Sequence, residues 1–182
     1  MLLATALALG AAVLHAGWNF AVKQSVGDRF LALWGQFFLA GLISLPIVLI
    51  WPMPARGWIW ATLSGLVHVG YTRFLAHAYT TGDLSMVYPV ARGGGAALAA
   101  VGGILFLDDD LSVLALVAIG VVVCGLVALA GRATSAALWQ AIAVAVTIGI
   151  YSVSDAHGIR STGSSTYAFS SFVTASVTIS AA

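Results

Sequence analysis

Residues 82–107 read GDLSMVYPVARGGGAALAAVGGILFL, and this stretch decides the fold. Most of it is a run of apolar and small residues as long as a membrane-spanning helix, which needs about 20 residues to cross the hydrocarbon. Its first half nevertheless carries Asp83, Tyr88, Pro89 and Arg92. A charge at the centre of a spanning helix costs about 2.5–3.5 kcal/mol on insertion scales, so such residues usually face the protein interior or a watery cavity. The stretch therefore predicts a spanning helix with a polar entrance.

The composition of the whole chain indicates the same environment. The 182 residues are 61% hydrophobic and only 7% charged, with a mean hydropathy of +1.04. Soluble domains carry about 25% charged residues, so lipid must surround most of this chain. The net charge is +1 without any basic run, and we expect no nucleic-acid partner. Cys124 has no second cysteine with which to form an internal disulfide or a metal site.

Apolar runs recur along the entire sequence. Six of them are long enough to span a membrane, and a seventh begins near the end of the chain. The connections between them are short and marked by charged or turn-forming residues. The sequence therefore predicts an all-α, polytopic membrane bundle. The predicted spans are 2–22, 30–51, 57–79, 84–107, 111–131, 136–154 and 165–182.

A faint internal repeat occurs at an offset of 137 residues. Lys23 falls on Arg160 and Phe30 falls on Tyr167, so each copy has an apolar span, a basic residue, a short polar loop and an aromatic residue. A unit of five spans is odd, which turns the second copy upside down, and inverted repeats are typical of secondary transporters. We expect residues 1–132 to form a first five-helix repeat and 133–182 the incomplete start of a second.

Polar residues share a face in the first and third predicted spans. His15 and Trp18 lie with Asn19 at the spacing i, i+3, i+4. His68 lies with Tyr71 and Thr72 in the same pattern on the third span. Two interpretations remain open for both groups: the wall of a cavity, or hydrogen bonds that hold neighbouring helices together.

Small residues follow the polar start of the fourth span. Ala91, Gly95, Ala99 and Gly103 recur every four residues, and such a ridge lets another helix approach closely. Arg92 lies beside this ridge and faces either an anionic group of a substrate or the lipid headgroups. We therefore expect the fourth span to be tightly packed and to line a pathway.

Three motifs in this order resemble the EamA-type family of the drug/metabolite transporter superfamily. They are LHAGWNFAVKQS at 14–25, AYTTGDLSMVYPVARGGG at 78–95 and LDDDLS at 107–112. The later stretch YSVSDAHGIRSTGSS, at 151–165, is similar to the start of the family's second repeat, although Ala156 and His157 interrupt the pattern.

The resemblance implies ten helices in two inverted five-helix repeats, with a central cavity lined by the first, third and fourth helices of each repeat. It also implies a secondary carrier, which exports small metabolites, amino acids or drugs across a bacterial inner membrane, and a cytoplasmic N-terminus. Charge counting alone leans the other way, because three basic residues follow odd spans and two follow even spans. These residues are Lys23, Arg29 and Arg132 against Arg56 and Arg160. We follow the resemblance.

On this hypothesis the bilayer and a small-molecule substrate are the main partners. If transport is coupled to protons, His68 and then Asp155 are the expected coupling residues, because histidine changes charge near neutral pH. No metal-ligand cluster or nucleotide-binding loop is present, so we expect neither a cofactor nor enzymatic activity. The substrate-cavity candidates are His15, Trp18, Asn19, His68, Tyr71, Thr72, Tyr88 and Arg92.

Two alternatives remain open. In the first, because the sequence stops within its seventh apolar run, we expect either a fragment of a longer carrier or a half transporter that depends on a second copy or another half-size partner. A half that lacks such a partner would be non-functional. In the second alternative, His15 and His68 bind haem in a membrane redox protein, which an absorption spectrum would reveal.

Overall fold

The computed structural model describes residues 2–24, 27–131 and 134–182, and in these residues the chain forms seven helices. Arg132 and the predicted repeat boundary at 132/133 lie outside the described residues. The helices are α1 (Leu2–Gln24), α2 (Arg29–Ile50), α3 (Ala55–Thr81), α4 (Leu84–Leu107), α5 (Val113–Ala130), α6 (Ser135–Thr162) and α7 (Tyr167–Ser180).

Several helices begin where a side chain can accept a hydrogen bond from the first turn. Asp28 accepts from the backbone N–H of Phe30 at 2.8 Å, which caps α2. Ser112 caps α5 and Thr134 caps α6 in the same way. These caps satisfy amide donors that have no partner within their own helix.

The predicted end of the sixth span, at residue 154, is wrong. Helix α6 continues for eight residues to Thr162, so the segment interpreted as a polar loop is helical. Its polar side chains have partners on other elements, which explains the continuation: Asp155 contacts Tyr167 and His157 packs against Trp60. The helix ends at Gly163, which adopts the left-handed conformation (φ +61°) that a C-terminal cap requires.

Five of the seven helices are long and apolar enough to cross a membrane, namely α1, α2, α4, α5 and α6. Helix α3 has 27 residues but is too polar to meet that criterion, and α7 has only 14 residues. The structure thus supports a multi-pass helical membrane protein, and the number of seven spans stays a prediction.

The outer surface of the bundle is strongly apolar. No residue of α5 is buried, and Val113 and Leu114 are each 78% exposed. On α2, Ile43 and Leu49 are 71% and 72% exposed. Contiguous apolar surface of this kind is rare on soluble monomers and is expected where acyl chains cover it.

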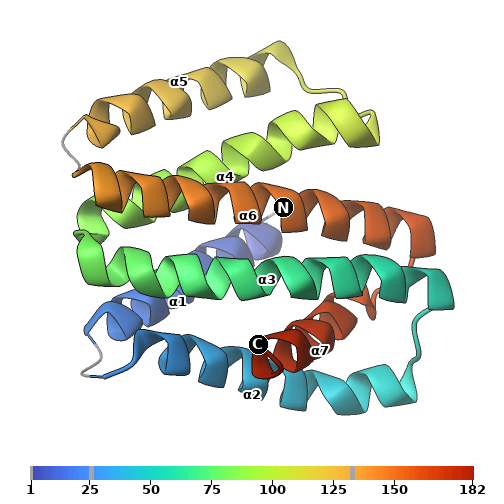
Figure 1. The fold of residues 1–182 in the computed structure, drawn as a ribbon. Helices are drawn as coiled ribbons and strands as arrows, with labels where there is room; N and C mark the ends of the chain where they lie inside the picture. The colour runs from blue at the N-terminus through green and yellow to red at the C-terminus, as the bar shows by residue number, and fades with distance from the viewer. Residues whose placement is uncertain (1, 25–26, 132–133) are drawn as a thin grey trace.

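The seven helices do not pack in sequence order. Helix α6 lies between α3 and α4 and makes its most extensive contacts with both (Figure 1). Helix α7 packs against α2 and α3, while α5 lies at the edge of the bundle against α4. The last two helices are therefore inserted among the first four, and this arrangement creates the central site.

Glycines bring α4 and α6 into close contact. A Cβ atom added to Gly95 would lie 2.6 Å from Cβ of Ile148, and one added to Gly102 would lie 2.5 Å from Cγ2 of Val153. A larger residue would force the helices apart, so the contact depends on the missing side chains. The predicted ridge is used only in part, because Gly103 lies against Asp109 of the following connection rather than against a helix.

Candidate binding cavity

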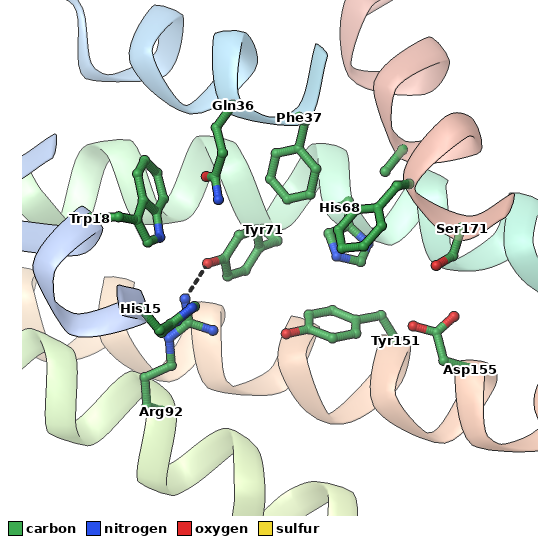
Figure 2. A pocket seen from close by; sticks show the side chains of 12 residues that line it. His15, Trp18, Gln36, Phe37, His68, Tyr71, Arg92, Tyr151, Asp155 and Ser171 are labelled. Carbon is green, nitrogen blue, oxygen red and sulfur yellow. Dashed lines mark hydrogen bonds between the residues drawn. The ribbon is translucent and has the colours of Figure 1, made fainter. Parts of the chain in front are cut away.

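A cavity of about 300 Å³ lies where six helices converge. It receives side chains from every helix except α5, and Figure 2 shows its lining residues from close by. The lining residues are His15 and Trp18 from α1, Gln36 and Phe37 from α2, His68 and Tyr71 from α3, Arg92 from α4, Tyr151 and Asp155 from α6, and Ser171, Phe172 and Ala175 from α7.

Arg92 provides a positive charge at one end of the cavity. Its Nη2 atom donates a hydrogen bond to the Tyr71 hydroxyl at 2.6 Å. Its guanidinium carbon lies 5.5 Å from the ring centroid of Tyr71 and 6.0 Å from that of Tyr88, within the range of a cation–π contact. No carboxylate in the described part of the chain forms an ion pair with Arg92. The side chain points into the cavity rather than toward the headgroups.

Two side chains of α1 lie at the same end as Arg92 (Figure 2). The His15 ring is tilted against that of Tyr88, with their centroids 6.5 Å apart. The indole Nε1 of Trp18 is buried and has no hydrogen-bond partner among the described residues. A buried N–H donor without a partner is costly, so this end of the cavity offers an unused donor.

Aromatic rings form the middle of the cavity. His68 stacks on Tyr151 with their centroids 4.3 Å apart, and Phe37 contacts the His68 ring edge-on at 5.2 Å. Nδ1 of His68 lies 2.8 Å from the carbonyl oxygen of Ser64. Because a carbonyl oxygen only accepts, Nδ1 carries the proton, and the neutral ring keeps Nε2 as an acceptor.

Asp155 lies at the other end of the cavity, one turn beyond Tyr151 on α6 (Figure 2). Its Oδ1 atom accepts a hydrogen bond from the Tyr167 hydroxyl at 3.0 Å. Tyr167 can lie so close to α6 because Gly158 faces it, and a Cβ atom at Gly158 would collide with the tyrosine ring. The carboxylate is therefore held by a neutral group from α7.

The structure places six of the predicted residues in the cavity wall: His15, Trp18, His68, Tyr71, Arg92 and Asp155. Three other candidates lie outside this cavity. Asn19 is buried in a helix contact, where its Oδ1 accepts from the Tyr79 hydroxyl at 2.7 Å. Thr72 is fully buried and donates to the carbonyl of His68 on its own helix. Tyr88 lies beside Arg92, outside the lining residues.

Sequence reasoning missed the contributions of α2 and α7, which the resemblance does not place at the cavity. The sequence held a signal for Gln36, because it is the only amide in the predicted span 30–51 and polar residues inside spans usually face the interior. No sequence signal marked Tyr151 or Phe172, since aromatic residues are common on every face of a spanning helix. Their place in the wall follows from how α6 and α7 insert among the other helices.

No family model matches the chain, and neither a curated protein nor a solved structure matches it. The likeness to EamA-type carriers therefore rests on the sequence alone, chiefly on the three motifs at 14–25, 78–95 and 107–112. Within those motifs, His15, Trp18 and Arg92 are the residues that line the cavity.

Proposed function

We propose that this chain belongs to a secondary membrane carrier of the EamA type, and that a small polar molecule passes through the central cavity. The observation that carries the proposal is the convergence of charged and aromatic side chains inside a bundle whose outer surface is apolar. Ionisable residues within spanning helices are costly and commonly mark the path of a substrate or ion.

The position of the cavity supports the proposal. Carriers built from inverted repeats bind their substrates where the repeats meet, near the middle of the bilayer. Here α6 and α7, from the region assigned to the second repeat, supply one side of the cavity and α1 to α4 supply the other. Shifting the limits of α1 by the repeat offset of 137 gives 139–161, which falls within α6. The same shift carries Trp18 onto Asp155, and both residues line the cavity.

A second candidate is a half transporter that works only with a partner, either a second copy or another half-size protein. The observation that favours it concerns α1, which supplies two cavity residues although most of its own surface is exposed. Polar contacts attach it to the end of α3: Lys23 Nζ donates to the carbonyl of Tyr79 in α3 and to that of Gly82 directly after it, each at 2.6 Å. A partner helix packed on α1 would complete the wall.

Efflux from liposomes tests the proposal. The purified chain is reconstituted into vesicles loaded with a mixture of unlabelled polar metabolites, a pH gradient is imposed, and the external solution is analysed by mass spectrometry. We expect at least one metabolite to leave faster than from protein-free vesicles. Arg92→Gln should slow that efflux about tenfold or more, since it removes the cavity cation. Arg56→Gln, at an exposed position outside the cavity, is the matched control.

The same assay separates the two candidates. Efflux per molecule that does not depend on the ratio of protein to lipid supports a carrier formed by one chain. A rate per molecule that rises with protein density supports a carrier formed with a second copy. Absence of efflux at every density would contradict transport by this chain without a different partner.

A further inference from the structure

We propose that the cavity accepts a ligand with an anionic group at one end and a cationic group at the other. Arg92 would bind the anionic group, a carboxylate, phosphate or sulfonate, and Asp155 would bind the cationic group, an ammonium or guanidinium. This inference rests on the proposed function, because it names the substrate class of the same site.

The end of the cavity at Arg92 is rich in donors and lacks a negative charge. A guanidinium has five N–H donors; Arg92 donates one of them to the neutral Tyr71 hydroxyl at 2.6 Å, and the hydroxyl of Tyr151 is a second neutral acceptor beside it. The buried N–H of Trp18 has no partner in the described part of the chain and lines the same cavity. An oxyanion offers several acceptor lone pairs at once, so it would satisfy both donors and compensate the charge.

The end of the cavity at Asp155 has the opposite character. Its carboxylate accepts from the Tyr167 hydroxyl and has the Ser64 hydroxyl beside it, yet both groups are neutral and an ionised carboxylate can accept about four hydrogen bonds. The basic groups that follow on α6 are engaged elsewhere. Arg160 forms an ion pair with Asp109 at 2.7 Å, and His157 packs on the Trp60 ring with their centroids 4.2 Å apart. A cationic ligand group would supply the missing charge.

The two charges are kept from neutralising each other. Asp155 is four residues after Tyr151, which is about 6 Å along the helix axis, and the rings of Tyr151 and His68 stand between it and Arg92 (Figure 2). Burying two unpaired charges in a low-dielectric interior is unfavourable for both. A ligand that reaches both ends would compensate both charges, while the rings contact its body. A ligand with a single charge would leave one of them unpaired.

Binding of matched probes to the purified full chain in detergent tests the inference. The probes are a series of unbranched ω-amino acids of increasing length, each compared with the carboxylic acid and the amine of the same chain length, and calorimetry measures their affinity. We expect at least one ω-amino acid to bind about tenfold or more tightly than either single-charge analogue, a difference of about 1.4 kcal/mol. Equal binding of an acid or an amine to the wild-type chain would overturn the inference.

Variants assign each end of the ligand. Arg92→Gln should reduce the affinity for the ω-amino acid to that for the amine, and Asp155→Asn should reduce it to that for the acid. Arg92→Lys keeps the charge and should retain part of the preference. The controls are Arg56→Gln and Asp110→Asn, at exposed positions outside the cavity. A variant that does not elute as a single species in gel filtration is set aside, and the wild-type probe series then decides.

The test also separates this inference from the proposed function. Tight binding of an ω-amino acid without efflux from vesicles would support the ligand class and contradict the carrier. Efflux of metabolites without any preference for doubly charged probes would support the carrier and overturn the ligand class.

Discussion

His68 lies in the middle of the cavity, with its ring between Tyr151 and Phe37 and its Nδ1–H directed at the Ser64 carbonyl. This hydrogen bond sets the tautomer, so Nε2 of the neutral ring is the nitrogen that can take up a proton. From the sequence, proton coupling by His68 was predicted only from the depth of the residue within the third predicted span. The structure adds that the ring is on the cavity wall, where a proton and a substrate can affect one another.

We expect His68→Ala to remove the pH dependence of efflux between about pH 5 and pH 8, the range in which histidine changes charge. His68→Gln, whose side-chain amide can still donate to Ser64, should also remove it while preserving the packing. His77→Ala is the control, because His77 is on the same helix but is exposed and lies outside the cavity. The pH profile is measured in the vesicle assay. A His68→Gln profile that matches the wild type would eliminate His68 as the coupling residue.

Helix packing depends on positions that lack side chains. Helices α4 and α6 meet at Gly95 and Gly102 from one side and at Gly149 from the other, where an added Cβ atom would lie 2.8 Å from Cβ of Leu98. In a bilayer, helices gain little from burying apolar surface against each other, because lipid tails are equally apolar. Close van der Waals contact therefore holds this pair together, and the pair positions Arg92 opposite Tyr151.

Replacing Gly95 by alanine should destabilise the protein. The added methyl group would press on the branched side chain of Ile148, and overpacking of this kind costs about 1–3 kcal/mol. Gly120→Ala on α5 is the matched control, because nothing lies within 4 Å of its added Cβ atom. Thermal unfolding in detergent, followed by circular dichroism, should show a lower midpoint for Gly95→Ala and an unchanged or slightly higher one for Gly120→Ala. Equal unfolding midpoints for the two variants would contradict close packing of α4 against α6 at Gly95.

At the scale of the whole molecule, neighbours in the chain are not neighbours in space. Helices α3 and α4 follow each other directly, yet they contact each other little because α6 lies between them (Figure 1). Helix α7 is likewise packed on α2 and α3. The helices of the region assigned to the first repeat thus contact α6 and α7 more extensively than they contact one another.

A chain cut between α5 and α6 should therefore fold only when both pieces are present. We expect α1–α5 alone to aggregate when extracted from the membrane, since the surfaces of α3 and α4 that contact α6 would be uncovered. Co-expression of α6–α7 as a separate piece should restore a monodisperse complex in gel filtration, with both pieces co-purifying. As a control, a cut between α4 and α5 should be tolerated better, because α5 packs only at the edge of the bundle. A monodisperse α1–α5 piece would contradict this account of the packing.

The sequence by itself determined the environment, the helical class and most of the helix limits. Long apolar runs must form helices in lipid, because no water is present to bond the backbone groups, and this requirement acts within each segment. The prediction for 84–107 therefore agrees with α4 at both ends. The predicted end of the sixth span at residue 154 is wrong, because the continuation of α6 depends on Tyr167 and Trp60, which belong to other segments.

Only the tertiary structure decided which polar faces form the cavity. Helical spacing put Asn19 beside Trp18 and Thr72 beside Tyr71, but it could not assign each side chain to the cavity or to a helix contact. That choice depends on partners distant in the chain. The hydroxyl that donates a hydrogen bond to Asn19 belongs to Tyr79, which is 60 residues away. The insertion of α6 and α7 brought in Tyr151 and separated Arg92 from Asp155, because helix packing follows surface shape rather than sequence order.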